Sequence, residues 1–147
     1  MADLSVIGAA ALTCLAGGVL PWINAEVVVI GASMVLPTEA LPLLVLACAL
    51  AQTTSKSALY GLARWSPQRL PARAARLLGA AERYRDGRSL VALVLSGALL
   101  AVPPFYLVTL ACGLARVPFV SFALGGFVGT VTRYAFLAWI AFALAAP

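Results

Sequence analysis

The stretch LPWINAEVVVIGASMVLP, residues 20–37, decides the fold. It is apolar almost throughout, yet it carries the carboxylate of Glu26 close to the amide of Asn24, and Pro21 and Pro37 bracket it. Proline cannot continue a helix and restricts the residue before it, so this segment predicts a short helical arm that follows a turn at Pro21. A carboxylate in the first turn of a helix lies at the positive end of the helix dipole, and Asn24 is suited to cap that end.

The composition around this stretch indicates a membrane protein. Hydrophobic residues make up 63% of the 147 residues and charged residues only 10%, and the mean hydropathy is +1.03. A soluble domain is about a quarter charged. The start carries Asp3 and no Lys or Arg in residues 1–5, unlike a secretory signal. We therefore expect an all-α multi-pass protein whose first apolar run belongs to the mature fold.

Short apolar runs flank the prolines in both halves of the chain. The predicted arms are residues 4–20, 27–36, 91–102 and 105–115, and the predicted tips are Pro21, Pro103 and Pro104. A helix rises about 1.5 Å per residue, so a dozen residues cannot cross about 30 Å of hydrocarbon. Each pair of arms is predicted to form a re-entrant hairpin that enters and leaves the bilayer on one side. Residues 4–20 are numerous enough that a complete span remains an alternative.

Each predicted hairpin is followed by a long apolar run, residues 41–65 and 119–146, that can cross a bilayer. The segment TTSKSALY in the first run aligns with TVTRYAFL in the second, which places Lys56 over Arg133. A re-entrant hairpin returns to the side from which it enters, so a hairpin plus one crossing takes the chain to the other side of the membrane. The second copy would therefore be inverted relative to the first, which is a recurrent plan in transporters. We expect one membrane domain built from two inverted repeats, residues 1–65 and 89–147.

Residues 66–88 join the two predicted repeats and look hydrated. Together with Arg64 they hold seven of the ten basic residues. The positive-inside rule places this segment in the cytoplasm, and therefore both termini on the outer side. Apolar residues at helical intervals after Pro71 predict an amphipathic helix on the inner leaflet. The arginines are interpreted as determinants of topology and of contact with anionic lipids.

A few polar residues outside that segment are candidates for function. A charge inside the bilayer costs at least roughly 2.5–3.5 kcal/mol, so it usually faces a polar cavity or a partner. Glu26 could bind a proton or a cation, or could only stabilise its helix. Lys56 and Arg133 could pair with Glu26 or bind an anionic head group, or could extend to the interface. The candidates for substrate or proton binding are Glu26, Asn24, Lys56, Arg133, Arg116 and Tyr106; Arg116 could instead anchor a corner at the water interface.

Several other classes of function are disfavoured. The chain has no histidine, and no phosphate-binding loop or Ser/His/Asp set, so we expect neither an enzyme nor a catalytic residue. The three cysteines lie far apart in apolar runs and are interpreted as packing residues, with no metal site and no cofactor. Nothing indicates a nucleic-acid partner. The GGFVG segment, residues 125–129, matches a small-residue motif that lets helices approach closely, which makes a homodimer an expectation.

This arrangement resembles the DedA superfamily of VTT-domain membrane proteins. The segments that carry the resemblance are LPWINAEVVVIGASM, AQTTSKSALYGLARW, the arginine-rich segment and VPPFYLVTLACGLARVPFVSFALGGFVGTVTRYAF, over about residues 19–139. The resemblance implies two oppositely oriented re-entrant hairpins that meet in a bacterial inner membrane. It also implies movement of phospholipids or of a lipid-carrier phosphate between leaflets, or proton-dependent tolerance of alkali and cationic drugs.

The resemblance implies a role for Glu26, which matches an acidic residue of the family's first hairpin. It also brings a departure, because better-studied members carry arginines in the second hairpin and PPFYLVTLACG has none. A phosphate-binding role would then shift to Arg133 and Lys56. The chain is shorter at its start than typical members, so a second copy is expected to help enclose a path. Our first hypothesis is a lipid translocase, and the alternatives are a proton-coupled exporter of small cations and a membrane scaffold without transport.

Overall fold

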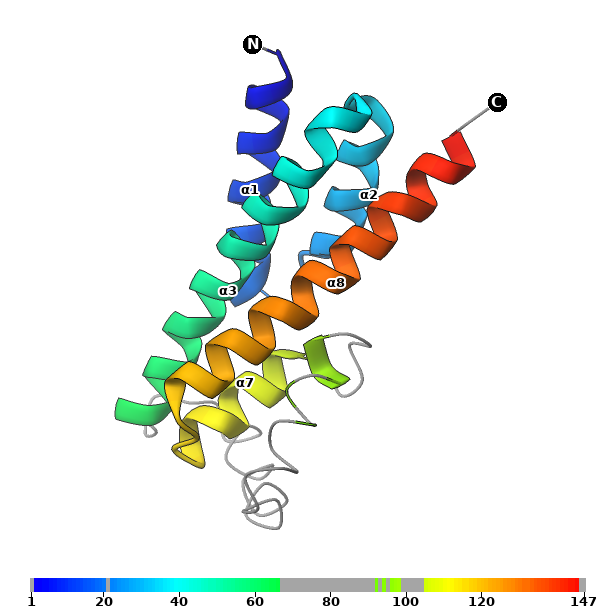
Figure 1. Ribbon diagram of the computed structural model, residues 1–147. Helices are drawn as coiled ribbons and strands as arrows, with labels where there is room; N and C mark the ends of the chain where they lie inside the picture. The colour runs from blue at the N-terminus through cyan, green and yellow to red at the C-terminus, as the bar shows by residue number, and fades with distance from the viewer. Residues whose placement is uncertain are drawn as a thin grey trace. The chain divides into compact units, whose positions relative to one another are not determined.

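The structure of the chain is a computed structural model that describes residues 2–20, 22–66, 92, 94, 96–98 and 105–145 (Figure 1). The predicted tips at Pro21, Pro103 and Pro104 lie outside these residues, as do 67–88 and most of the arm predicted over 91–102. Within the described residues, the elements are α1 (Ala2–Val19), α2 (Ala25–Val35), the 3₁₀ turn η1 (Thr38–Ala40), α3 (Leu41–Trp65), α7 (Phe105–Leu114) and α8 (Phe119–Ala145). They are all helical, which confirms the predicted all-α class.

Prolines and polar caps set the observed helix ends. Asn24 caps α2, as predicted, and the chain becomes extended at Leu36, directly before Pro37. Pro118 accepts the first backbone hydrogen bond of α8, from the N–H of Phe122 at 3.1 Å. The bounds of α3 and the starts of α7 and α8 are those predicted from the sequence, and the other bounds of the described helices differ by one or two residues. Whether the short helices are re-entrant, and whether the two halves form an inverted repeat, stay predictions.

The chain divides into two compact units. The first unit comprises Met1–Ser55 and Thr130–Pro147, and the second unit comprises Lys56–Gly129. The helices α3 and α8 therefore each contribute one part to each unit. The expectation of a single membrane domain is not tested by this division.

In the first unit, α1 and α2 pack side by side and run in opposite directions, forming a helical hairpin (Figure 1). The Cys14 thiol of α1 lies 4.0 Å from the carbonyl oxygen of Ala25 in α2. The side chains that are almost completely buried in this unit include Cys14, Val29, Leu44, Cys48 and Tyr134. Both cysteines of the unit are free and fully buried, as is Cys112 of the second unit, in agreement with their interpretation as packing residues.

The second unit has a core rich in aromatic side chains. Its buried cluster comprises Tyr60, Val94, Ala98, Phe105, Val108, Cys112, Val117 and Phe122. The Tyr60 ring stacks on the Phe122 ring, with 4.9 Å between their centres. The Tyr60 hydroxyl donates to the carbonyl oxygen of Val117 and accepts from Arg64, whose guanidinium nitrogen lies 2.6 Å away. These contacts attach the last turns of α3 to the corner between α7 and α8.

The GGFVG segment of α8 is used inside the second unit. A methyl group at Gly129 would lie 2.5 Å from the Cβ atom of Ala98, and one at Gly126 would lie 3.0 Å from the ring of Phe105. The small residues therefore allow close approach between helices of the same chain. The prediction that this motif marks a close helix contact is confirmed, whereas the homodimer expected from it stays a prediction.

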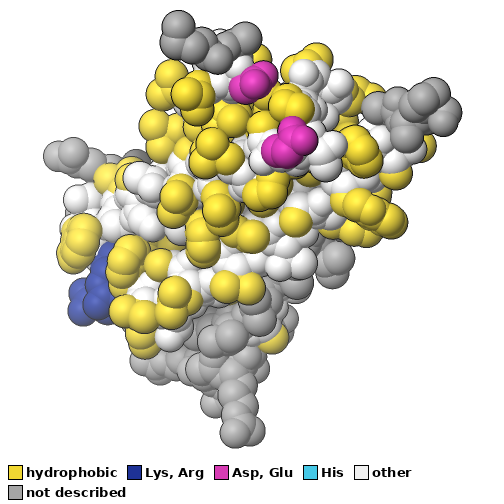
Figure 2. Space-filling model, turned by 45° about the horizontal axis from the view of Figure 1, so that its top comes forward, with side chains coloured by type: hydrophobic (Ala, Val, Ile, Leu, Met, Phe, Trp, Pro, Cys, Tyr) yellow, Lys and Arg dark blue, Asp and Glu magenta, His cyan; other side chains and the backbone are white. Residues whose placement is uncertain are grey.

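The surface formed by the described residues is strongly hydrophobic. Among the described residues, Figure 2 shows many hydrophobic side chains spread over the face that it presents, and few charged groups. Large apolar side chains such as Leu12, Val35 and Trp139 are each more than 60% exposed, whereas soluble proteins rarely expose extended apolar patches. Among the described residues, one helix is long and apolar enough to cross a membrane, at Phe119–Leu144. The helix α3 has 25 residues, but its polar middle, QTTSKS, lowers its mean hydropathy.

Candidate functional site

The carboxylate of Glu26 lies in the first turn of α2, at the end that the sequence predicted to carry polar groups. The backbone N–H of Glu26 donates to the side-chain oxygen of Asn24 over 3.0 Å, so Asn24 satisfies one of the N–H groups that a helix start leaves unpaired. The Glu26 carboxylate also benefits from the positive end of the α2 dipole. This local geometry confirms the predicted capping arrangement.

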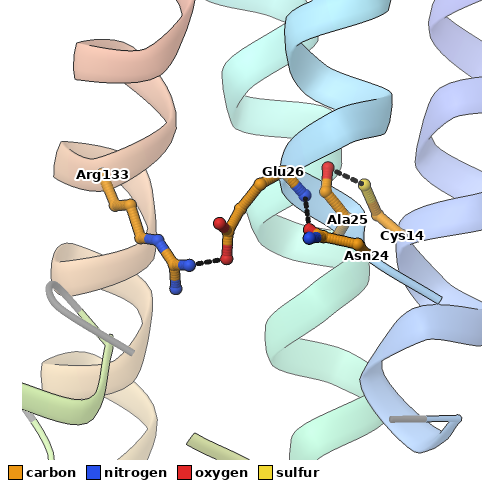
Figure 3. Close-up of polar contacts among 5 residues, drawn as sticks. All are labelled: Cys14, Asn24, Ala25, Glu26 and Arg133. Carbon is orange, nitrogen blue, oxygen red and sulfur yellow. Dashed lines mark hydrogen bonds and ion pairs between the residues drawn. The ribbon is translucent and has the colours of Figure 1, made fainter. Parts of the chain in front are cut away.

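Glu26 additionally forms an ion pair with Arg133 of α8, within the first unit (Figure 3). The two side chains point toward each other from neighbouring helices, and one guanidinium nitrogen contacts one carboxylate oxygen. The Arg133 side chain is 16% exposed and the Glu26 side chain 36% exposed. Pairing lowers the cost of holding two charges between apolar helices, and the Glu26 side chain stays partly exposed.

Lys56 belongs to the second unit and has a different environment. Only 5% of its surface is exposed, and its ammonium lies over the ring of Phe105, 5.0 Å from the ring centre. Arg133, one of the two cations that the sequence aligned with each other, pairs with Glu26 inside the first unit. Phe105 was not among the candidates from the sequence, although an aromatic residue directly after Pro103 and Pro104 was the available signal for a partner of Lys56.

The remaining candidates lie at opposite ends of α7. Tyr106, in the first turn, is half-buried and packs against Ala63 and Leu110. Arg116 lies beyond the last turn, is exposed, and has a φ of 54°. The N–H of Arg116 donates to the carbonyl of Gly113 over 3.2 Å, and the next N–H donates to the carbonyl of Cys112 over 3.0 Å. This pattern is a Schellman motif, which ends a helix at a residue in the left-handed conformation.

We expect replacement of Arg116 with glycine to stabilise the fold. The left-handed conformation costs an L-residue about 1–2 kcal/mol, part of which is offset by the greater chain entropy of glycine, so the net gain is about 0.5–1 kcal/mol. Arg116→Val should have the opposite effect, because a β-branched residue is poorly tolerated at positive φ. Thermal unfolding in detergent measures both changes. Equal melting temperatures for the two variants would contradict the observed conformation.

Within the described residues, no group of three or more His, Cys, Asp or Glu side chains is placed to hold a metal ion. The arrangement that remains is an ion pair in the first unit and a buried cation in the second. Neither provides a nucleophile with an adjacent base. The chemistry accessible to these groups is the binding of ions and of charged head groups.

Comparison with known families gives a match. The VTT-domain family model matches residues 20–142, most of the chain and both halves of the predicted repeat. Comparisons with curated proteins and with solved structures gave no match. The match agrees with the apolar surface and with the helices that the prolines delimit. The chain is a helical membrane protein that belongs to the VTT-domain family, also known as the DedA or SNARE-associated family.

Proposed function

We propose that the protein moves a phospholipid, or a lipid-carrier phosphate, between the leaflets of a bacterial inner membrane. The observation that carries this proposal is the ion pair between Glu26 and Arg133, held between helices whose other side chains are mostly apolar. A charged pair at such a place offers both a positive and a negative partner to a zwitterionic or anionic head group. An acceptor and a donor of this kind lower the cost of moving a polar group through hydrocarbon.

An apolar groove in the first unit supports a lipid over a small ion. The groove has a volume of about 620 Å³, and its lining residues come from α3 and α8, together with Thr38 of η1. It extends along α8 from Val131 to Phe142, which at about 1.5 Å per residue is roughly 16 Å. This length is about half the thickness of the hydrocarbon core, as one acyl chain requires. A small cation would gain nothing from such a surface.

In the proposed mechanism, polar side chains of the protein form a path for the head group beside the acyl chains of the bilayer. The head group exchanges with the Glu26–Arg133 pair while the acyl chains stay in the bilayer. In this proposal, two re-entrant hairpins related by an inverted repeat form the path, residues 66–88 face the cytoplasm, both termini face outward, and no bond of the substrate is broken. A second copy of the chain could complete the enclosure.

A proton-coupled exporter of small cations is the second candidate function. It is favoured by the partial exposure of the Glu26 side chain, because a carboxylate that pairs with a guanidinium and can reach water can exchange a proton for a cation. In that mechanism, Arg133 would hold the carboxylate in place when the cation has left. A membrane scaffold without transport is the third.

Reconstitution in vesicles with fluorescent phospholipids separates these candidates. The lipid that is accessible to an added membrane-impermeant quencher is measured with and without a pH gradient. Lipid movement in both conditions supports a translocase without proton coupling, and movement that requires the gradient supports coupling. Cation flux without lipid movement would favour the exporter. The absence of both would contradict transport and leave the scaffold.

A further inference from the structure

Two free thiols of the first unit lie against each other. Cys14 of α1 and Cys48 of α3 are both fully buried, and their side chains are in hydrogen-bond contact. Both residues belong to the first unit, whereas the third free cysteine, Cys112, belongs to the second. Two thiols in contact can approach the geometry of a disulfide through small rotations of their side chains.

The packing of α1 on α3 supports this pairing independently of the sulfur atoms. One turn beyond Cys14, a methyl group at Gly18 would collide with the hydroxyl of Ser55 and would lie 2.7 Å from the Cβ atom of that residue. It would also lie 3.1 Å from the side-chain oxygen of Gln52, which is one turn beyond Cys48. The two backbones are therefore close over consecutive turns, as a disulfide requires, because its Cα atoms lie only about 4.4–6.8 Å apart.

The Cys14 thiol also contacts the neighbours of both partners of the ion pair. It lies 4.0 Å from the carbonyl oxygen of Ala25, the residue before Glu26 (Figure 3). It is in hydrogen-bond contact with the side chain of Tyr134, the residue after Arg133, and Tyr134 is itself almost completely buried. Because protein interiors are close-packed, a change at this sulfur affects the helices that hold the ion pair.

We propose that Cys14 and Cys48 are a site of reversible disulfide formation by a membrane-permeant hydroperoxide. The sulfur of one thiol attacks the O–O bond, which breaks as the S–O bond forms, and the thiol proton moves to the departing oxygen; a sulfenic acid and an alcohol result. The second thiol then attacks the oxidised sulfur, so that the S–S bond forms, the S–O bond breaks and water leaves with the second thiol proton. In total, the two sulfur atoms lose two electrons to the hydroperoxide.

Burial of the pair selects the oxidant. Neither sulfur is exposed, so a large charged oxidant such as oxidised glutathione does not reach them in the folded protein. A small neutral hydroperoxide dissolves among apolar helices and reaches the thiols when these helices open locally. The second thiol converts the sulfenic acid to a disulfide before further oxidation, which keeps the reaction reversible. Cys112, in the hydrophobic cluster of the second unit, provides an internal comparison.

The disulfide has two expected consequences. It ties α1 to α3, which restricts the unfolded chain and raises the melting temperature. It also removes the hydrogen that the Cys14 thiol directs to Ala25 and fixes the hairpin of α1 and α2 in one arrangement. The effect on lipid movement rests on the proposed function, because a fixed hairpin cannot adjust around a head group at the ion pair. The formation of the disulfide does not rest on it.

Treatment of the purified full chain with tert-butyl hydroperoxide tests this site. The remaining thiols are blocked with iodoacetamide, and linked peptides are identified by mass analysis without reduction. We expect a link between Cys14 and Cys48 within one chain that dithiothreitol reverses, and a rise in melting temperature of about 5 °C or more. Oxidised glutathione should not form the link. In vesicles, lipid movement should fall by about fivefold or more on oxidation and recover on reduction.

Serine substitutions separate the pair from the other thiol. In Cys48→Ser the second thiol is missing, so Cys14 should stop at the sulfenic acid, which dimedone traps, and the melting temperature should not rise on oxidation. Cys112→Ser is the matched control, because it removes a buried thiol of the second unit, and it should form the link as the wild type does. The wild type before and after oxidation provides a measurement that needs no variant.

Three results would overturn the proposal. These are the absence of the link between Cys14 and Cys48 in the folded protein, linkage of Cys112 to the same extent, and a link that changes neither the melting temperature nor lipid movement. Failure here is distinct from failure of the proposed function. Lipid movement by a chain that forms no link would refute the disulfide only. A reversible link that raises the melting temperature of a chain without lipid movement would refute the transport proposal only.

Discussion

Replacement of Glu26 with glutamine is expected to reduce lipid movement in reconstituted vesicles by about tenfold or more. The glutamine keeps the size of the side chain but removes the charge that Arg133 contacts, so the guanidinium remains between apolar helices without its partner. Because the Glu26 side chain is 36% exposed, we expect the loss of stability to be about 1–3 kcal/mol, between the values for exposed and buried pairs. A tenfold change in rate corresponds to about 1.4 kcal/mol.

A double-mutant cycle separates the structural role of this pair from its role in transport. The variants are Glu26→Gln, Arg133→Gln and their combination, and each is measured for melting temperature and lipid movement. The double variant should recover part of the stability, since no charge is left unpaired, while its lipid movement stays low. Recovery of both would mean that the pair only holds α2 and α8 together. Glu39→Gln is the matched control, because it removes an exposed carboxylate near the start of α3.

Replacement of Gly113 with alanine is expected to destabilise the second unit. A methyl group at Gly113 would lie 2.5 Å from the carbonyl oxygen of Tyr60 and 2.7 Å from the Cβ atom of Ala63. Because one of these atoms belongs to the backbone of α3, it cannot move aside as a flexible side chain would, and α7 must shift. Overpacking of this kind costs about 1–3 kcal/mol, and Gly113→Val should cost more.

Gly8 of α1 provides the comparison for that substitution, since a methyl group there has no neighbour within 4 Å. Gly8→Ala should keep or raise the melting temperature, because alanine favours a helix by about 0.8–1.0 kcal/mol over glycine. Thermal unfolding of both variants in detergent, followed by circular dichroism, measures the difference. A Gly113→Ala protein that melts like the wild type would contradict the close packing of α7 on α3.

Local sequence rules predicted the helices and part of the site. The cap at Asn24 and the helix ends near Pro37 and Pro118 depend on residues close in sequence, so they could be predicted from the chain alone. The choice of Arg133 as a partner of Glu26 could not be predicted, because an alignment of two similar segments assigns the same role to Arg133 and Lys56. That choice depends on how helices distant in sequence pack.

The role of Arg116 shows a second limit of sequence analysis. A cation between two apolar helices was a candidate for binding, and its left-handed backbone conformation could not be inferred because glycine is the usual signal for it. Close packing of the GGFVG segment was expected, but the sequence could not predict that its partners are Ala98 and Phe105. A small-residue motif indicates that another helix can approach closely, but it does not indicate which helix that is.

Two buried thiols of the unmodified protein can be used to measure local unfolding of each unit. Cys14 lies in the first unit and Cys112 in the second, and both are fully buried. A maleimide can react with either only when the surrounding helices open, so the alkylation rate of each thiol follows the opening free energy of its own unit. Peptide mass analysis after timed alkylation would therefore resolve whether the two units open together or separately.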